Sequence, residues 1–441
     1  MKLIAAIALL LCAFGASAHA EAAPHIIFIL TDDLGPGDLG CYGGAIAATP
    51  NIDRLAKEGT RFTRYYSAAP ICSPSRCGLL TGNFPARWNV TSFMQTRAGN
   101  RECEQVDFLD PKAPSLSRQL KAAGYATAHV GKWHLGGGRD VRDAPKFAAY
   151  GYDEGAGTYE SPEPHPDITA KDWVWSQQDK VKRWDRTAFF VDRTLDFIAR
   201  HPAQPCFVNL WLDDPHTPWV PGENAAKGDT QEKLKAVMEE NDKQIGRLMD
   251  AVPANTLLIF ASDNGPLPTF EQQRASGLRG SKLSLYEGGI RLPFIARWPG
   301  RVPAGRVDET SVIAAVDMLP TLCAIAGAKL PAGYAGDGVD VSKALLREAL
   351  PRTRPLFWEY GRNDKSFKFP AAHNRSPNVA MLDGGWKLLV NADGSGAELY
   401  DLAADPNETK NLAEQQPDIA ARLKAAALAW RSALPGIPPA N

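Results

Sequence analysis

Apolar residues in this chain gather in short runs that end in polar side chains, and stretches with helical spacing separate the runs. Strand-like apolar runs occupy residues 25–30, 125–130, 206–212 and 256–261, and each is followed by Asp, Asn, Lys or His. Helical spacing predicts helices at 49–59, 115–123, 189–200 and 230–252. This alternation favours a mostly parallel sheet covered by helices. Because ligands bind at the carboxyl ends of such strands, the polar residues predict one shared site.

The pattern changes near residue 350. Short runs at 356–360, 379–382, 386–390 and 398–402 predict a small antiparallel sheet, and 417–432 has the spacing of an amphipathic helix. We therefore predict an α/β fold: a large, mostly parallel sheet sandwiched by helices, with a smaller C-terminal α+β subdomain. The predicted divisions are a signal peptide at 1–20, an N-terminal domain with the shared site at 21–350, and the C-terminal subdomain at 351–441.

Composition and charge place few limits on the function. The chain has 441 residues, 44% of them hydrophobic and 22% charged, with a formal net charge of −1. These values are typical of a globular protein with a large core. They give no indication of a nucleic-acid binder or of an electrostatic membrane binder.

Residues 1–20 have the pattern of a secretory signal peptide. Lys2 precedes an apolar run at 3–14, and small residues lead to expected cleavage sites after Ala18 or Ala20. The run is too short to span a bilayer and no later segment is long and apolar enough, so we expect no membrane span. The protein is therefore expected to be exported, to the periplasm or beyond the cell.

Six cysteines follow this segment, and their pairing is open. They are Cys41, Cys72, Cys77, Cys103, Cys206 and Cys323. An exported protein could join some of them in disulfides. A buried cysteine is otherwise usually a small apolar filler.

One of these cysteines stands in a motif. Residues 71–82 contain Cys72, Pro74, Ser75 and Arg76 in the order Cys-x-Pro-Ser-Arg, followed by Gly-Leu-Leu-Thr-Gly. This segment resembles the signature of the type I sulfatases, a family of the alkaline-phosphatase superfamily. In that family the cysteine is oxidised after synthesis to formylglycine, an aldehyde. The resemblance therefore implies cleavage of sulfate esters, and a formylglycine-generating maturation enzyme as a partner.

The likeness extends in order over most of the chain. Further blocks that match the family lie at 32–33, 131–136, 215–218, 262–265, 280–282, 286–293 and 398–408. One block could arise by chance, but so many in the family's order would very rarely do so. The chain is similar to the bacterial carbohydrate sulfatases and to the N-acetylgalactosamine-6-sulfatase-like group.

A metal site is predicted from the side chains themselves. Asp32, Asp33, Asp263 and Asn264 offer only oxygen ligands, which suit Ca²⁺ or Mg²⁺ and not zinc. A single Asp after a strand often only caps a turn, but two such pairs, each closing an apolar strand, favour a cation site. The resemblance implies Ca²⁺ over Mg²⁺, and it adds the modified Cys72 as a ligand.

The resemblance also implies a nucleophile. A hydrated aldehyde at Cys72 carries two hydroxyls on one carbon, so one can attack sulfur while the other later re-forms the aldehyde and expels sulfate. Asp263 would accept a proton from the attacking hydroxyl, Arg76 would hold the hydrate, and His134 would take the proton of the second hydroxyl. Pro74 is expected to start a helix whose N-terminus favours an anion.

Three more catalytic positions follow from the resemblance. Lys132 and Lys282 would bind the sulfate oxygens, and His216 would protonate the leaving alcohol. Outside these blocks, a lysine or histidine after a strand would more simply be a solvated loop residue. The glycines Gly131 and Gly136, which flank the block at a strand end, favour the functional interpretation.

Export and a polar, irregular segment at 135–185 favour a sulfated carbohydrate as the substrate. Candidate residues for binding the sugar are Trp173, Trp175, Trp184, Trp219, His165, Arg183, Arg362, His373 and Glu359. Aromatic faces can stack on sugar rings, but such tryptophans are equally often local core. The sequence leaves open the sugar, the sulfate position, endo or exo action and the oligomeric state.

Two other functions fit parts of the pattern. A phosphodiesterase or phosphonate monoester hydrolase of the same superfamily shares the metal ligands, but Lys132, His134, His216 and Lys282 together favour sulfate. A non-catalytic protein that binds sulfated glycans is the second alternative. It is disfavoured because binding alone requires no general acid.

Overall fold

The computed structural model describes residues 23–438, except 159, 169–177, 226–227 and 367–371. The predicted signal peptide at 1–20 lies outside the described residues, as do Trp173 and Trp175. None of the helices in the described part of the chain combines the length and apolar character that a bilayer-spanning helix needs.

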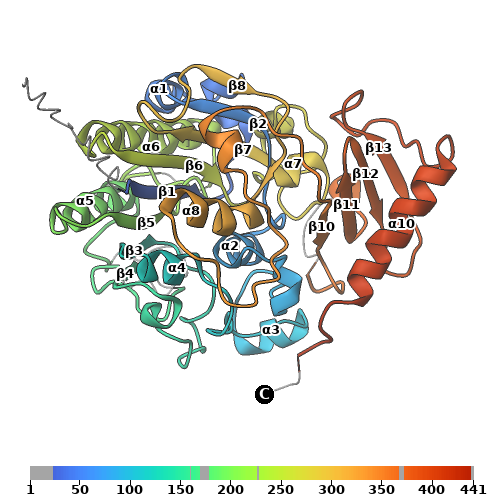
Figure 1. Ribbon diagram of the computed structural model, residues 1–441, viewed down its shortest axis with the longest axis horizontal. Helices are drawn as coiled ribbons and strands as arrows, with labels where there is room; N and C mark the ends of the chain where they lie inside the picture. The colour runs from blue at the N-terminus through green and yellow to red at the C-terminus, as the bar shows by residue number, and fades with distance from the viewer. Residues whose placement is uncertain (1–22, 159, 169–177, 226–227, 367–371, 439–441) are drawn as a thin grey trace, which may run out of the picture.

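A nine-stranded sheet forms the centre of the molecule, in the order β4-β3-β5-β1-β6-β7-β2-β8 with β9 beside β2 (Figure 1). Its strands are β1 (His25–Thr31), β2 (Thr60–Tyr66), β3 (Ala126–Gly131), β4 (Glu154–Gly157), β5 (Cys206–Trp211), β6 (Thr256–Ser262), β7 (Arg291–Arg297), β8 (Arg306–Asp308) and β9 (Ile313–Ala314). Strands β4, β3, β5, β1 and β6 run parallel. The predicted mostly parallel sheet is therefore confirmed.

Strand β7 runs antiparallel to both of its neighbours, β6 and β2. The sequence pattern did not predict β2, in which Arg61 and Arg64 interrupt the apolar residues, or β7, which overlaps the motif block at 286–293. Strands β8 and β9 then pair with β2 in parallel and complete this edge of the sheet.

Helices cover both faces of the sheet. The α-helices are α1 (Pro50–Lys57), α2 (Cys72–Thr81), α3 (Arg97–Glu102), α4 (Leu116–Ala122), α5 (Arg186–Ala199), α6 (Gln231–Ala251), α7 (Glu287–Ile290), α8 (Met318–Ala326), α9 (Ser342–Leu346) and α10 (Pro417–Ser432). In β1, Ile27 and Ile29 join a core with α1, α5 and α6, whereas Ile26 and Phe28 join a core with α2, α4 and α8. Both sets are buried because alternate side chains of a strand point to opposite faces.

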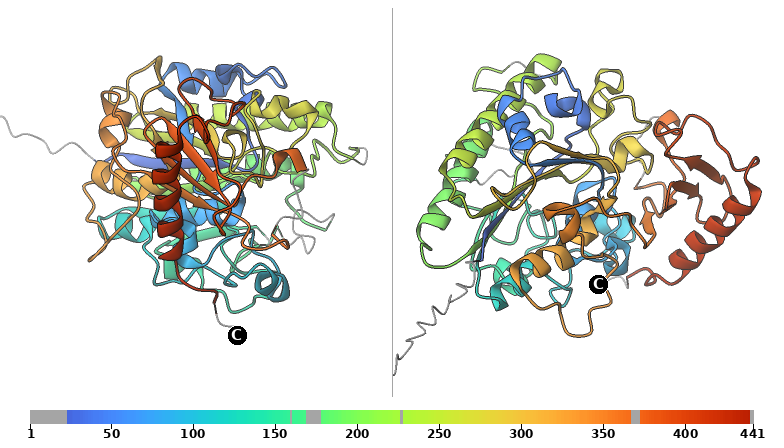
Figure 2. Two further views of the ribbon diagram at one scale, coloured as in Figure 1. Left: turned by 90° about the vertical axis from the view of Figure 1, so that its right-hand side faces the viewer. Right: turned by 45° about the horizontal axis from the view of Figure 1, so that its top comes forward.

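A second, four-stranded antiparallel sheet follows in the order β10-β11-β12-β13. Its strands are β10 (Leu356–Glu359), β11 (Val379–Asp383), β12 (Trp386–Val390) and β13 (Glu398–Asp401). Helix α10 packs on this sheet through Leu423 and Ala427, and Figure 2 shows this unit beside the main sheet and its helices. The predicted short antiparallel sheet is confirmed, and the boundary near residue 350 stays a prediction.

Candidate active site

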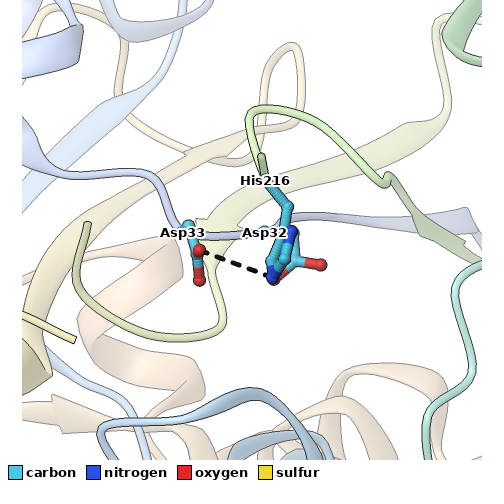
Figure 3. A group of neighbouring side chains, drawn as sticks. All are labelled: Asp32, Asp33 and His216. Atoms are coloured by element: carbon cyan, nitrogen blue, oxygen red, sulfur yellow. Dashed lines mark ion pairs between the residues drawn. The ribbon is translucent and has the colours of Figure 1, made fainter. Parts of the chain in front are cut away.

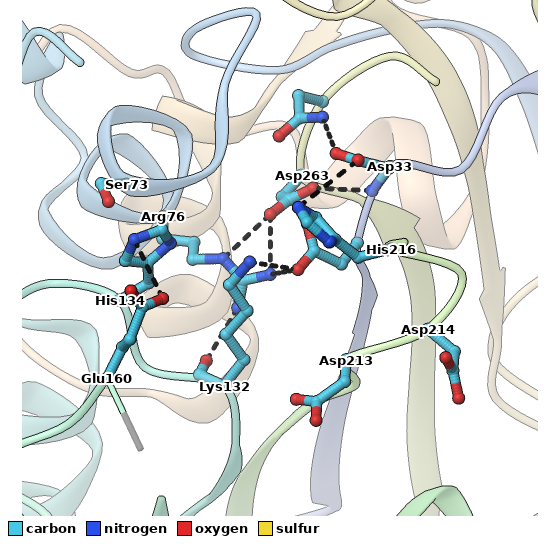
Figure 4. Close-up of polar contacts among 12 residues, drawn as sticks. Asp33, Ser73, Arg76, Lys132, His134, Glu160, Asp213, Asp214, His216 and Asp263 are labelled. Carbon is cyan, nitrogen blue, oxygen red and sulfur yellow. Dashed lines mark hydrogen bonds and ion pairs between the residues drawn. The ribbon is translucent and has the colours of Figure 1, made fainter. Parts of the chain in front are cut away.

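Four neighbouring strands of the main sheet place the predicted polar residues at one edge. Asp32 and Asp33 follow β1, Lys132 follows β3, His216 lies after β5, and Asp263 follows β6. These strands lie side by side in the order β3-β5-β1-β6 and end at matching levels, so residues far apart in sequence converge. Figure 4 shows these side chains gathered around a shared centre.

Helix α2 delivers the motif cysteine to this centre. The helix begins at Cys72, after an extended Ile71 with φ −154°, so the expected start at Pro74 was wrong by two residues. Proline is tolerated in a first turn, where backbone N–H groups lack helical partners. Cys72 and Arg76 are four residues apart and share one face of the helix. Burial raises the pKa of the Cys72 thiol, and the charges of Lys132 and Lys282 oppose that rise.

Arg76 is fully buried and ties the helix to the strand ends. Its Nε donates to Asp263 Oδ2 at 2.9 Å, and its Nη1 donates to the carbonyl oxygen of Lys132 at 2.7 Å. Its Nη2 lies 2.7 Å from Asp263 Oδ2 and 3.6 Å from Asp32 Oδ2. The guanidinium also lies over the Trp211 ring, 5.3 Å from its centroid. These contacts fix Arg76 in one orientation next to Cys72.

Two lysines pair with the two aspartates after β1. Lys282 Nζ lies 2.7 Å from Asp33 Oδ1, and Lys132 forms an ion pair with Asp32. Burial alone would raise the pKa of both carboxyls, but the neighbouring cations lower it below the usual range. Together with Arg76, the two lysines make three buried cationic side chains. They face three buried carboxyl groups, those of the two aspartates and of Asp263.

The pKa of the Asp263 carboxyl shifts in the opposite direction, upward. Burial and the neighbouring Asp32 carboxylate raise its pKa to about 8, against the opposing charge of Arg76. A further positive charge near this pair would favour the ionised form of Asp263.

The site has the chemistry of a cation site that takes oxygen ligands. Asp32 Oδ1 and Asn264 Oδ1 are buried acceptors without a hydrogen-bond partner. Asn264 Nδ2 donates to Asp33 Oδ1 at 2.6 Å, which directs the amide oxygen elsewhere. Oxygens of Asp32 and Asp33 and a ring nitrogen of His216 lie within 4.8 Å of one another (Figure 3). The two unsatisfied acceptors fit a hard divalent cation, which binds oxygen ligands. Without such a partner, these buried oxygens would lower the stability of the fold.

His216 lies over this carboxylate pair. Its Nδ1 donates to the carbonyl oxygen of Thr217 at 2.6 Å, which directs Nε2 toward Asp33 Oδ2 at 3.7 Å. Burial and the charge of Lys282 lower the pKa of His216 to about 3, although Asp33 and Asp32 act in the opposite direction. The imidazole is therefore neutral at pH 7 in this state of the site.

His134 is held by a main-chain carbonyl and a carboxylate. Its Nε2 donates to the carbonyl oxygen of Met94 at 2.9 Å and lies 3.2 Å from Glu160 Oε2. Its Nδ1 is buried without a partner. Burial lowers the pKa of His134 to about 4 despite the Glu160 carboxylate. Glu160 was not among the predicted residues, because nothing in the irregular segment around it distinguished this glutamate.

A narrow pocket opens onto this centre. Its described lining residues are Asp32, Lys132, Thr158, Glu160, Arg183, Asp213 and His216. Its volume is about 10 Å³, which is room for about one water molecule. Of the candidate sugar-binding residues, Arg183 is the one in the described part of the chain that lines it.

The other described candidates for sugar binding lie elsewhere. Trp219 is 1% exposed and packs on Phe270, so it is local core. Arg362 pairs with Glu359 at 3.1 Å, and both are largely buried. The last three are Trp184, in a separate groove, His165, which packs on Phe189, and His373, which is exposed.

None of the described cysteines forms a disulfide. Cys72, Cys77, Cys103, Cys206 and Cys323 are buried as free thiols, and Cys41 is partly buried. Burial raises the pKa of Cys77 and Cys206 as well, which is the behaviour of unreactive filler residues.

Comparison with protein families gives two matches along the chain. The family described as Sulfatase matches residues 24–328. The family described as N-sulphoglucosamine sulphohydrolase, C-terminal, matches residues 281–431. Together they cover both sheets.

Similar proteins of known name are sulfatases. An N-acetylgalactosamine-6-O-sulfatase of Bacteroides thetaiotaomicron is 29% identical and covers 91% of each chain. The human N-acetylgalactosamine-6-sulfatase is 34% identical over 77% of this chain and 68% of its own length. Human arylsulfatase A is 32% identical over 91% of this chain and 86% of its own length.

Solved structures share the fold. A Bacteroides thetaiotaomicron structure, described in connection with the metabolism of multiple glycosaminoglycans, superposes with a TM-score of 0.75 at 26% identity, covering 93% of this chain and 99% of that chain. A phosphonate monoester hydrolase of Agrobacterium radiobacter superposes with a TM-score of 0.65 at 21% identity, covering 93% and 95%. The second likeness concerns the fold alone.

Proposed function

Because this chain belongs to the sulfatase family and is a sulfuric ester hydrolase, we propose that it releases sulfate from a sulfated carbohydrate by means of a formylglycine derived from Cys72. The observation that carries the proposal is the position of Cys72. It is the first residue of α2, and it is buried where Arg76, Lys132 and Lys282 face three carboxylates. Such a site binds an anion beside a nucleophile.

The modification supplies the nucleophile. Formylglycine at position 72 offers a carbonyl that adds water, which gives a hydroxyl nucleophile and a built-in way to release the sulfuryl group. Arg76 orients this side chain, because its own position is fixed by Asp263 and by the Lys132 carbonyl. Asp263 accepts the proton of the attacking hydroxyl, for which its carboxyl must be ionised. Burial and Asp32 raise its pKa to about 8, and the positive charge of a bound cation would favour the ionised form.

We propose that Asp32, Asp33, Asp263 and Asn264 hold a divalent cation, Ca²⁺ before Mg²⁺, together with the modified residue 72. Such a cation would supply positive charge beside residue 72 and the sulfate oxygens. Lys132 and Lys282 would then turn from the carboxylates toward the sulfate. Their ammonium groups stand against the same carboxylates that would hold the cation.

His216 is the proposed general acid for the leaving alcohol. Its Nδ1–H is committed to the Thr217 carbonyl, so Nε2 is the nitrogen that would take up the transferable proton and pass it on. A bound sulfate ester adds negative charge next to the ring and raises its low pKa. His216 is therefore protonated, and able to act as an acid, when substrate is present.

His134 is the proposed base for the step that frees sulfate. Its Nε2 proton is used by the Met94 carbonyl, so Nδ1 holds a lone pair, and this nitrogen has no partner. With its pKa lowered to about 4, the ring is neutral and able to accept a proton throughout the neutral range.

The sulfated carbohydrate is proposed from the named relatives. The bacterial and human relatives are named for N-acetylgalactosamine 6-sulfate, and a sulfated hexosamine is accordingly the first substrate to test. The expected export to the periplasm or beyond, and the maturation enzyme, remain part of the proposal.

A substrate panel tests the function. Protein with peptide-mass evidence of formylglycine at residue 72 is assayed with sulfated mono- and oligosaccharides, with phosphate diesters and with phosphonate monoesters. We expect inorganic sulfate from one sugar and one position, at a kcat/KM well above that for any phosphorus ester. A clear preference for a phosphate diester or phosphonate would replace the proposal with the alternative hydrolase. Tight sugar binding without release would indicate a glycan-binding protein.

A further inference from the structure

One wall of the active-site pocket contains an arginine and an aspartate that the proposed mechanism does not use. Arg183 opens a short 3₁₀ turn, Arg183–Asp185, just before α5, and Asp213 follows β5. Both line the pocket with Asp32, Lys132 and His216. Arg183 is 1% exposed and Asp213 is 7% exposed. They are therefore part of a built wall of the site.

Arg183 is fixed through one end of its guanidinium. Its Nη2 donates to the carbonyl oxygens of Asp213 at 3.3 Å and of His216 at 3.2 Å, and it forms an ion pair with Asp214. Asp213 is fixed in a similar way, because its Oδ2 accepts from Arg186 Nη1 at 2.6 Å. The side chains of Asp213 and Asp214 point in different directions (Figure 4), and Asp214 is the one whose carboxylate pairs with Arg183.

The remaining polar atoms of this pair are buried and unpaired. Nε and Nη1 of Arg183 and Oδ1 of Asp213 have no hydrogen-bond partner. A buried donor or acceptor without a partner is costly, and the cost is higher for a charged group. Donors and an acceptor left open on the same pocket wall indicate a ligand that both accepts and donates hydrogen bonds.

A hydroxyl group meets this requirement, whereas an ion does not. An anion would be repelled by Asp213, and a cation would be repelled by Arg183. A hydroxyl can donate to a carboxylate and accept from a guanidinium at the same time. We propose that Arg183 and Asp213 bind a ring hydroxyl of the sulfated sugar that lies near the sulfate ester.

The contact with His216 relates the bound hydroxyl to the reacting ester. Arg183 contacts the carbonyl oxygen of His216 itself, and His216 is the group assigned to the ester oxygen. A hydroxyl held by Arg183 and Asp213 therefore lies close to the reacting ester. The pair would orient the sugar ring and select its configuration, which deepens the proposed function and rests on it.

The first test changes the substrate and leaves the protein intact. Wild-type protein with confirmed formylglycine is assayed with the preferred sulfated monosaccharide and with analogues in which each ring hydroxyl is replaced by hydrogen. We expect one analogue to lose about tenfold to a hundredfold in kcat/KM, the usual size for a hydrogen bond to a charged group. If every analogue stays within about twofold, the pair binds only water and the inference is overturned.

The second test changes Asp213. In Asp213→Asn, kcat/KM for the intact sugar should fall about as far as it does for the sensitive analogue, with little further loss when the two changes are combined. The loss on 4-nitrophenyl sulfate, which has no ring hydroxyl, should be much smaller. Asp185→Asn is the matched control, since Asp185 lies in the same turn as Arg183 but is exposed. This control should leave kcat/KM unchanged for both substrates.

The outcomes separate this inference from the function on which it rests. If the wild-type protein releases no sulfate from any sugar, the proposed function fails first. If it releases sulfate, but Asp213→Asn loses equally on sugar and aryl sulfates, the function stands and the hydroxyl assignment is wrong.

Discussion

The amide nitrogen of Asn264 donates to Asp33 Oδ1 at 2.6 Å, and the amide oxygen of the same side chain is buried without a partner. Asn264 thus uses a donor to fix one carboxylate and keeps its acceptor available. An aspartate here would set two carboxylates against each other. The asparagine makes sense if its oxygen completes a cation site.

Removal of the cation should therefore lower both activity and stability. A ligand at 100 times its Kd adds about 2.7 kcal/mol to the stability of the folded state. We expect chelation to lower Tm by several degrees and abolish sulfate release, and Ca²⁺ to restore both. In Asn264→Ala the Ca²⁺-induced rise in Tm should shrink. Full activity in exhaustively chelated protein would exclude the cation from the mechanism.

His216 should matter most for poor leaving groups. General acid catalysis contributes about 10²–10⁴-fold, and a nitrophenolate needs little of it. His216→Ala should lower kcat/KM by about a hundredfold or more on a sugar sulfate and by much less on 4-nitrophenyl sulfate. Because His216 Nε2 lies 3.7 Å from Asp33 Oδ2, equal losses on both substrates would instead indicate a role as a ligand or support of the metal site.

His129 should make the protein less stable in acid. This buried ring packs against Trp133, Phe147, Tyr152 and Trp211, and burial lowers its pKa to about 3. The unfolded chain takes up the proton near pH 6.5, so the stability is fully present above that pH. It is lost as the pH falls toward 3, by up to about 1.4 kcal/mol per pH unit.

Urea unfolding between pH 7.5 and 4.5 measures this slope. His129→Phe keeps an aromatic ring in the cluster and should flatten the slope by close to one proton. His134, whose pKa is also lowered, should supply part of the slope that remains. His373→Gln, a change at an exposed position, is the control. An unchanged slope in His129→Phe would show that His129 does not titrate between the folded and unfolded states.

Lys387 should be essential for attachment of the second sheet. Its Nζ lies 2.8 Å from Glu287 Oε1 and 2.9 Å from Glu408 Oε1, and all three side chains are buried. Glu408 Oε2 also accepts from the backbone N–H of Glu287 at 2.6 Å, at the start of α7. Lys387→Met should cost about 3–5 kcal/mol, because it leaves the buried Glu408 carboxylate without a cation and leaves Glu287 with Arg291, 3.6 Å away, as its cationic partner.

An exposed pair on the same subdomain is the matched control. Arg422 pairs with Asp383 at 2.9 Å in a solvated position, so Arg422→Met should cost less than about 1 kcal/mol. Combining Lys387→Met with Glu408→Gln should recover part of the loss. If Lys387→Met and Arg422→Met cost the same in urea unfolding, the buried cluster does not hold the two sheets together.

Much of this site could be predicted from the chain because strand ends are local features. Asp32, Lys132, His216 and Asp263 each follow an apolar run, and the parallel sheet brings those ends together. The periodicity alone predicted β1, β3, β5 and β6, and the motif singled out Cys72. The start of α2 was misplaced because a proline suits several positions of a first turn.

The pocket wall could not be predicted in the same way. Glu160 reaches His134 from an irregular segment, and its partner is fixed only by the folded chain. The open atoms of Arg183 and Asp213 depend on which of their other atoms are already bonded to Arg186, Asp214 and main-chain carbonyls. The spacing of apolar residues does not tell which donors and acceptors are paired in the folded chain. The antiparallel strand β7 was not predicted for a related reason. Its place between β6 and β2 depends on how the whole chain folds.

The most direct test relates sulfate release to the chemical state of residue 72. Preparations that differ in formylglycine content, quantified by peptide mass, are assayed on the best sulfated sugar, with Cys72→Ala as the blank. The account predicts that kcat rises in proportion to formylglycine occupancy and passes through the origin, with no release from Cys72→Ala. Sulfate release that persists with unmodified Cys72 or with alanine would contradict it.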